Sequence, residues 1–294
     1  MELKSTCKLS VATILSCVIM TSAQPARADV IVLPELQAAT LFGASAANNN
    51  SSSGPGIFVG SDGGGNPKRG LIEFNIAGSL PSNATITSAS LSLVLGQVAG
   101  SGAGNAGDQT PRTIRLFDVT TNWAGGTNGV STPNPPGSFP SFSGTGQGFA
   151  PNTGDVTWNF SKFNTIPWAT PGGGGDFSST ESADTLVTNA LGTYTWGSTP
   201  QMVSDVQGWL DGTLPNFGWL LKNDSEAVPT SFRAFDTTLN PELAPKLIIT
   251  FDVPAAVPEP STLGLTALGA LAILSLRRRR NRQNNSSTNC PPGI

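Results

Sequence analysis

Short runs of alternating apolar and polar residues, set between glycines and prolines, constrain this chain more than any other feature. Residues 89–95 place four apolar side chains on one face, and residues 71–76 and 247–253 repeat the pattern. A period of two is that of a β-strand, whose side chains point alternately to opposite faces. Many short strands joined by turns favour a sandwich or a barrel, so the sequence predicts an all-β fold. Shorter strands are expected over residues 30–33, 39–42, 56–60, 113–119, 156–160, 193–196 and 217–222.

One helix stands out among the predicted strands. Thr199 suits the N-cap, Pro200 suits the first helical position, and apolar residues then recur at helical spacing. Gly212 supplies a stop, so we expect a short helix that closes one end of a sandwich. Residues 48–55 and 123–154 are loops by composition, and a Gly/Pro-rich loop as long as the second is either functional or mobile.

The first 28 residues have the features of a secretory signal peptide. Lys4 and Lys8 form a positive n-region, and residues 9–20 form an apolar stretch that is too short to span a bilayer. Ala28 completes an Ala-x-Ala cleavage site. The mature chain is therefore expected to begin at Asp29.

The C-terminus has three parts in a fixed order. Pro258-Glu259-Pro260 precedes an apolar run over residues 263–276, and a cluster of arginines follows. The run is short for a span, but clustered arginines stop transfer and remain in the cytoplasm. We expect a linker over residues 254–262, a transmembrane helix over 263–276 and a cytoplasmic basic tail over 277–294. The membrane stop consists of Arg277, Arg278, Arg279 and Arg280.

This tripartite tail resembles the PEP-CTERM sorting signal of Gram-negative bacteria. The resemblance implies that a membrane transpeptidase called exosortase recognises Pro258-Glu259-Pro260 and that cleavage follows near this motif. It also implies an inner-membrane-anchored precursor that is then delivered to the cell surface or the extracellular matrix. One departure is the polar extension of 12 residues after Arg282, because tails of this family usually stop soon after the basic cluster.

Two features of the composition limit the catalytic groups, metal sites and disulfides that the chain can form. The chain has no histidine, which excludes Ser-His-Asp and Cys-His nucleophiles and every zinc site that uses histidine. The three cysteines, Cys7, Cys17 and Cys290, all lie outside the exported part over residues 29–253. That part must therefore be stabilised by its core and not by disulfides.

The exported part is strongly acidic. Between Asp29 and Val257, 8 Lys and Arg stand against 17 Asp and Glu, a net charge of −9, whereas the whole chain has −3. Such a domain is a poor non-specific ligand for nucleic acid or for an anionic membrane. Strongly anionic polysaccharides would be repelled as well, unless a cation bridged them.

Trp123 and Trp168 lie at the edges of loops, beside glycine and proline. An exposed indole with nearby Asn and Asp suits a sugar ring, which stacks its C–H face while its hydroxyl groups form hydrogen bonds. The alternative is that both indoles pin the long loop to the sandwich. Trp209 and Trp219, in contrast, are expected in the core, Trp209 because it lies on the apolar face of the predicted helix and Trp219 because it alternates in phase with Phe217 and Leu221.

A structural calcium ion (Ca2+) is a further expectation, because calcium needs only oxygen ligands and carboxylates are plentiful in the loops. No EF-hand spacing occurs, so the sequence leaves the metal ligands unknown. The carboxylates that lie in or beside loops are Asp62, Asp108, Asp155, Asp176 and Asp184.

Several segments of the exported part together resemble a DNRLRE domain, a β-sandwich module of secreted bacterial and archaeal proteins. The strongest is Asp205-Val206-Gln207-Gly208-Trp209-Leu210 with Asn216-Phe217-Gly218-Trp219, and Pro245-Lys246-Leu247-Ile248-Ile249 matches the end. The resemblance covers residues 29–252 and implies a jelly-roll-like sandwich related to carbohydrate-binding modules. One departure is Asp236-Thr237-Thr238-Leu239-Asn240, where the family often has a Ser-Arg or Ser-Glu segment.

These features predict a non-enzymatic, exported surface or matrix protein that binds or organises extracellular polysaccharide in a biofilm or floc. Its expected partners are an exosortase, the polysaccharide and, before processing, the membrane, with no nucleic acid. Two alternatives stay open: a structural matrix or adhesion protein without a specific sugar site, and a polysaccharide-degrading enzyme. The sequence places no two carboxylates at the distance a glycosidase needs, so no catalytic residue is assigned.

Overall fold

The structure is a computed structural model that describes residues 27–50, 54, 56–102, 105–126, 148–254, 269 and 271–280. The chain divides into two compact units. One is the segment Arg27–Pro254, which holds every strand that the structure describes and one α-helix, and the other combines Met1–Ala26 with Ala255–Ile294. The expected exported domain, residues 29–253, lies within the first unit.

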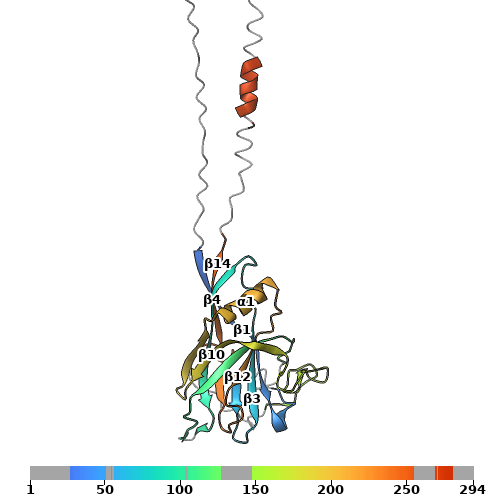
Figure 1. Cartoon of the computed structure of the whole chain (residues 1–294), viewed down its shortest axis with the longest axis vertical. Coiled ribbons are helices and arrows are strands. Elements are labelled where there is room, and N and C mark those ends of the chain that lie inside the picture. The colour runs from blue at the N-terminus through green and yellow to red at the C-terminus, as the bar shows by residue number, and fades with distance from the viewer. Residues whose placement is uncertain are drawn as a thin grey trace, which may run out of the picture. The chain divides into compact units, whose positions relative to one another are not determined.

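Six antiparallel strands of this domain close into a barrel-like ring (Figure 1). Their order is β1 (Arg27–Phe42), β14 (Lys246–Val253), β4 (Thr85–Val98), β13 (Arg233–Asp236), β2 (Gly56–Ser61) and β3 (Pro67–Phe74), and β3 pairs with β1. From β3 the sheet continues through β12 (Trp219–Asn223) and β7 (Arg112–Val119) to β10 (Phe177–Val187). Strand β11 (Gly192–Gly197) pairs with β4. The β-rich fold expected from the sequence is confirmed.

Four further short strands pair in twos outside this sheet. Strand β5 (Ser101–Gly102) pairs with β6 (Asn105–Ala106), and β8 (Phe160–Lys162) pairs with β9 (Ile166–Pro167). A single turn of 3₁₀ helix, η1 (Ala44–Ala46), follows β1. The α-helix of the domain is α1 (Pro200–Asp211).

Strand β1 joins the two halves of the ring. Its first half pairs with β14 as far as Pro34, and after a register shift at Glu35 its second half pairs with β3. The sequence predicted two short strands here, and they are one continuous strand. Ala28 and Asp29, expected at the signal cleavage site, pair with β14, so both ends of the domain lie side by side (Figure 1).

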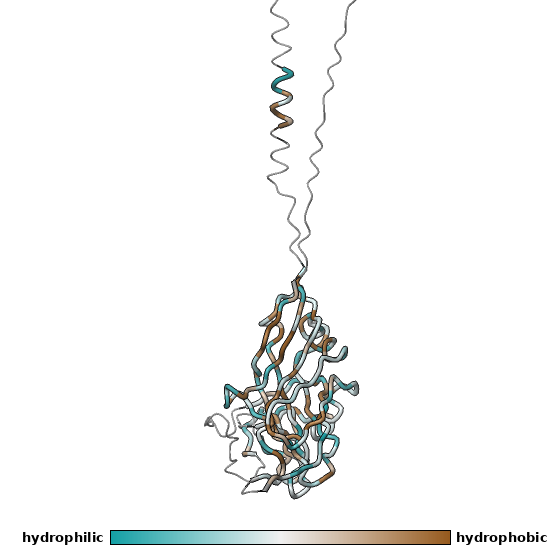
Figure 2. The backbone as a smooth tube through the Cα atoms, turned by 90° about the vertical axis from the view of Figure 1, so that its left-hand side faces the viewer, coloured by the Kyte–Doolittle hydropathy of each residue, from teal (hydrophilic) through white to brown (hydrophobic). Residues whose placement is uncertain are grey.

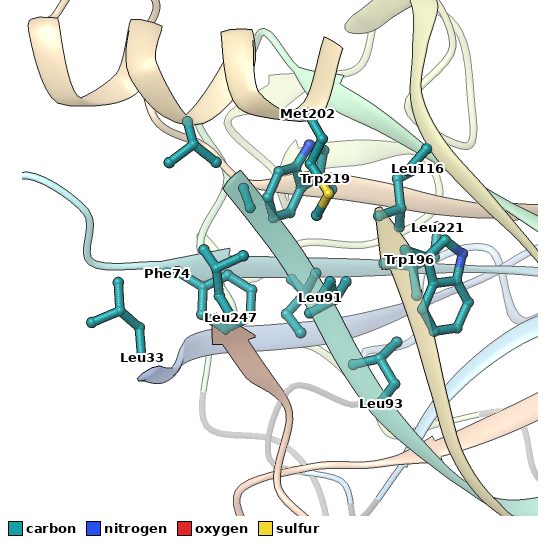
Figure 3. Packing of buried hydrophobic residues seen from close by; sticks show 14 of the residues in the cluster. Leu33, Phe74, Leu91, Leu93, Leu116, Trp196, Met202, Trp219, Leu221 and Leu247 are labelled. Atoms are coloured by element: carbon teal, nitrogen blue, oxygen red, sulfur yellow. The ribbon is translucent and has the colours of Figure 1, made fainter. Parts of the chain in front are cut away.

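The main core fills the space inside the ring and beneath α1, where the inward faces of the strands meet (Figure 3). Leu91 of β4 lies beside Leu247 of the neighbouring strand β14, and Leu91, Leu93 and Leu247 are each 0% exposed. The alternation that predicted these strands is therefore the alternation of buried and solvent-facing side chains. Trp209 and Trp219, expected in the core, are 3% and 0% exposed.

One predicted strand is absent from the structure, two observed strands were not predicted, and one expectation about the topology is not tested. Residues 156–160, predicted as a strand, form none before Phe160, because the backbone there bends and turns. Strands β10 and β13 were not predicted, since neither shows a clear alternation of apolar residues. The jelly-roll order of connections stays a prediction.

Residues 271–280 are helical, and this helix changes from apolar residues to the four arginines (Figure 2). Among the residues that the structure describes, no helix is both long and apolar enough to cross a membrane. The transmembrane helix expected over residues 263–276 stays a prediction. The signal peptide up to Ala26 and the Pro258-Glu259-Pro260 motif lie outside the described residues.

Candidate functional site

Trp123 and Trp168 are buried, which corrects their assignment as candidate sugar-binding residues. Their side chains are 2% and 4% exposed. The indole N–H of Trp123 donates to the carbonyl oxygen of Phe217 at 2.8 Å, and that of Trp168 donates to the carbonyl oxygen of Thr157 at 2.8 Å. Neither ring leaves a face on which a sugar could stack, and both pin the loops to the sheet.

These tryptophans belong to a second apolar cluster on the outer face of the sheet. Leu41 of β1, Leu71 of β3 and Leu220 of β12 point outward and are covered by the indoles and Val156. The residues of the long loop region that the structure describes are thus a layer of the fold. Asn50, fully buried, ties this layer down by donating its side-chain amide to the carbonyl oxygens of Gly125 and Val156.

Helix α1 forms as the sequence predicts. The Thr199 hydroxyl accepts a hydrogen bond from the backbone N–H of Met202 at 3.0 Å, which caps the first turn. Gly212 ends the helix in the left-handed region with φ 70°. The buried face of α1, including Val206 and Trp209, packs on the core, so the opposite face is fixed at the surface.

A groove of about 590 Å³ lies along this outer face of α1, and we call it the α1 groove. Val203 and Leu214 contribute aliphatic surface, while Ser204, Thr213 and Asp211 contribute hydroxyl and carboxylate oxygens. Pocket volumes of about 300–1,000 Å³ are typical of small-ligand sites. The sequence did not reveal this groove, because Thr85 and Ile86 of β4 complete it from a distant part of the chain.

Two buried carboxyl groups meet where α1 packs on the sheet, Asp205 on the buried face of α1 and Asp118 on β7. Asp205, 1% exposed, accepts hydrogen bonds from Ser182 and from the indole N–H of Trp219, and Asp118, 5% exposed, accepts one from the indole of Trp209 at 3.0 Å. Burial, assisted by the nearby charge of Asp205, raises the pKa of Asp118 to about 7. Neither carboxyl group is among the described residues that line the α1 groove.

Two further carboxylates, Asp224 and Glu226, are held by basic side chains. Asp224 accepts two hydrogen bonds from Arg115, and Glu226 accepts two from Arg69. Arg69 also lies over the ring of Trp158, with 5.1 Å between the guanidinium carbon and the ring centroid. These ion pairs fasten loops to strands.

The part of the chain that the structure describes contains no cluster of carboxylates that could bind calcium. Within those residues, no three Asp, Glu, Cys or His side chains gather closely enough to hold a metal ion. Asp62 is paired with Lys68 at 2.9 Å, and Asp176 accepts hydrogen bonds from Thr121 and from the backbone of Ala169. These two loop carboxylates are thus used in separate local contacts, and the structural calcium ion stays a prediction.

Two more carboxyl groups, Glu35 and Asp236, each have one buried oxygen atom that accepts no hydrogen bond from a described residue. Burial raises the pKa of both, that of Asp236 to about 6. Glu35 lies at the register shift of β1, where its other oxygen accepts two hydrogen bonds from Thr238. Sequence reasoning missed these groups, because an acidic residue near a loop gives no sign of its burial.

The comparison with known families concerns the tail of the chain. Residues 256–280 match the family model of the PEP-CTERM protein-sorting motif. The chain carries a PEP-CTERM sorting signal. The interpretation of Pro258-Glu259-Pro260 and the arginine cluster as such a signal is confirmed, and the signal indicates an exported protein that is sorted by an exosortase. No curated protein matches the chain.

Proposed function

We propose that the domain Arg27–Pro254 is a non-enzymatic module of the cell surface or extracellular matrix that binds or organises polysaccharide. The sorting signal supports its delivery to that location. The resemblance to DNRLRE domains supports a relation to carbohydrate-binding modules. The observation that carries the proposal is the α1 groove, since it presents the mixed surface that a sugar requires.

A sugar ring has apolar C–H faces and a rim of hydroxyl groups, so its site needs aliphatic surface beside donors and acceptors. In the α1 groove, Val203 and Leu214 provide the aliphatic surface, and Ser204 and Asp211 provide the hydrogen-bonding groups. No lysine or arginine is among the described residues that line it. The groove therefore suits the neutral part of a polysaccharide chain.

Affinity electrophoresis of the domain through gels that contain the producing cell's own polysaccharide tests this function. Ser204 is exposed on α1 and makes no side-chain hydrogen bond to a described residue, so Ser204→Trp should fill the groove without disturbing the fold. The matched control is Thr193→Trp, at an exposed position of β11 away from the groove. We expect retardation of the wild type and the control, and its loss in Ser204→Trp.

Equal mobility of all three proteins with and without polysaccharide would contradict binding and favour the purely structural alternative. The enzymatic alternative predicts new reducing ends or unsaturated products when the domain is incubated with the polysaccharide. Their appearance would overturn the non-enzymatic assignment. The buried state of Asp118 and Asp205 is the reason we expect none.

We also propose cleavage near Pro258-Glu259-Pro260, after a stage in which residues 263–276 anchor the precursor in the membrane. The motif begins four residues after Pro254, where the described domain ends. A double variant, Pro258→Ala with Glu259→Ala, should accumulate as an uncleaved, membrane-held precursor in immunoblots of cell fractions. Pro254→Ala, outside the motif, should be processed as the wild type is. Normal release of the double variant would contradict the proposal.

A further inference from the structure

A second surface pocket, away from the α1 groove, has the opposite electrostatic character. Its volume is about 320 Å³, near the lower end for small-ligand sites. Gly100 and Gly107 line it from the turns around the β5–β6 hairpin, Thr230 from the segment before β13, and Asp108 and Arg112 from the start of β7. We call it the Arg112 pocket.

Two guanidinium groups share a single carboxylate at this pocket. Arg112 binds Asp108 through Nε at 2.8 Å and Nη2 at 3.1 Å, and Arg233 binds the same carboxylate through Nη1 at 3.0 Å. Both arginines are buried, at 8% and 0% exposed. Hydrogen bonds from Arg112 and Arg233 outweigh burial and lower the pKa of Asp108 to about 2, so it stays charged at neutral pH. The cluster therefore carries one net positive charge.

Arg112 has one edge of its guanidinium group still open. A guanidinium group can meet a carboxylate along its Nε–Nη2 edge or along its Nη1–Nη2 edge. Asp108 occupies the first edge, and Nη1 makes no hydrogen bond to a described residue. Arg233, in contrast, uses all three nitrogens, on Asp108, Thr188 and Thr110. Only Arg112 of this pair can receive a further oxyanion.

The other ion pairs of the described domain have no such surplus. Arg115 faces three carboxylates, Arg69 is engaged by Glu226, and Lys68 is engaged by Asp62. The domain has a net charge of −9, so carboxylates are in excess over basic groups. Ion pairing within the fold therefore does not explain why two guanidinium groups share one carboxylate at this pocket. At physiological salt the screening length is about 8 Å, so the adjacent charges dominate what a ligand in the pocket experiences.

Thr230 forms part of the pocket wall opposite the guanidinium cluster. It is exposed, and its hydroxyl makes no hydrogen bond to a described residue. Its backbone has φ 59°, which is rare for a β-branched residue, and it is held there by an N–H that donates to the carbonyl oxygen of Asp62 at 2.8 Å. The Thr230 methyl group lies toward Gly100 and its hydroxyl toward Gly63, so Thr230 shapes the wall of the pocket beside Arg112.

We propose that the Arg112 pocket binds the carboxylate group of an acidic sugar residue, with the Nη1–Nη2 edge of Arg112 as the donor. This inference rests on the proposed function, because it names an acidic component of the polysaccharide that the domain binds. It also supplies the place at which an acidic domain can hold an anionic polysaccharide without a bridging cation.

Calorimetry of the wild-type domain with an oligosaccharide of galacturonic acid tests the proposal, and a galactose oligosaccharide of equal length is the neutral control. We expect saturable binding of the acidic oligosaccharide and at least about tenfold weaker binding of the neutral one, because each hydrogen bond to a charged group contributes strongly. Inorganic sulfate separates the sugar from a bare oxyanion, and we expect it to bind more weakly than the acidic oligosaccharide. Sulfate that binds as tightly would overturn the assignment to a sugar.

Arg112→Lys keeps a positive charge beside Asp108 but removes the planar second edge. We expect it to lose at least about tenfold in affinity. Arg115→Lys, on the same strand and surrounded by carboxylates, is the matched control and should bind as the wild type does. Unchanged affinity in Arg112→Lys would overturn the proposed geometry.

Amide chemical shifts of the wild-type domain locate the ligand independently of any variant. The acidic oligosaccharide should move the signals of Gly100, Gly107 and Thr230, and shifts confined to other residues would overturn the site. If the native polysaccharide binds but the amide signals of Gly100, Gly107 and Thr230 do not shift, this inference fails and the proposed function stands. If no polysaccharide binds at all, the proposed function fails as well.

Discussion

Replacing Asp118 by asparagine should stabilise the domain at alkaline pH. The Asp118 side chain is 5% exposed, and its Oδ1 accepts a hydrogen bond from the Trp209 indole at 3.0 Å. Asparagine has nearly the same shape and keeps an oxygen atom for this bond. What it removes is a negative charge that burial and the neighbouring Asp205 disfavour.

The size and sign of the effect follow from the pKa of Asp118. It is raised to about 7 in the folded domain, whereas an unfolded aspartate has a pKa of about 3.9. The folded state therefore holds the proton more tightly, and stability falls as pH rises from about 4 to about 7. Three pKa units correspond to about 4 kcal/mol, which the wild type has lost above pH 7 and Asp118→Asn retains. For a domain of this size that is a difference of about 10 °C in melting temperature.

Thermal unfolding of residues 27–254, followed by circular dichroism at pH 4 and pH 8, measures this difference. The matched control is Asp184→Asn on the adjacent strand β10, whose carboxylate is 52% exposed. We expect the control to change the free energy of unfolding by less than about 1 kcal/mol at either pH. A destabilised Asp118→Asn at pH 8, or an equal change at both pH values, would refute the reasoning.

Four further substitutions test the fold around the candidate sites. Trp123→Ala should lower the free energy of unfolding in urea by about 3–5 kcal/mol, because the indole is buried, and a loss below about 1 kcal/mol would contradict its place in the outer-face cluster. Gly218→Ala should fail to fold or lose several kcal/mol, since its Cβ would lie 1.9 Å from the carbonyl oxygen of Ile72. Gly212→Ala, with a similar φ of 70° and no atom within 4 Å of its Cβ, should cost only about 1 kcal/mol. Asp236→Asn should raise stability at pH 8 by about 3 kcal/mol and leave it unchanged at pH 4, because burial raises the pKa of Asp236 to about 6; a pH-independent effect would argue against this.

The strands that the sequence predicted are those with one face buried and the other in solvent. Strand β4 alternates between core and surface along most of its length, so its period of two is visible in the residue types. Strand β10 buries only Ser182, Ala183 and Val187, and it is fixed mainly by its pairing with β7. Strand β13 is buried at all four positions and includes a charged residue at each end, so it carries no alternation to recognise.

The tryptophans show the limit of reasoning from composition. Trp209 and Trp219 could be placed because their neighbours repeat at helical or strand spacing, and both lie in the core. Trp123 and Trp168 stand in irregular segments where no period applies. Their burial results from a layer that packs on the outer face of the sheet, and no local pattern of residues in the sequence predicts such a layer.

The candidate sites could not be predicted because they join distant segments. The α1 groove needs Thr85 beside Leu214, and the Arg112 pocket needs Thr230 beside Gly107. The sorting signal is the opposite case. Its motif, apolar run and arginine cluster are contiguous, and a signal that is recognised as sequence can be identified from sequence.

Retention in the extracellular matrix tests the central claim most directly. The full chain and its Ser204→Trp variant would be produced in the native cell, and the fraction of each that remains in the washed matrix would be measured by immunoblot. Binding through the α1 groove predicts that both are exported and processed equally, while the variant is washed out. Equal retention of the two proteins would contradict the account.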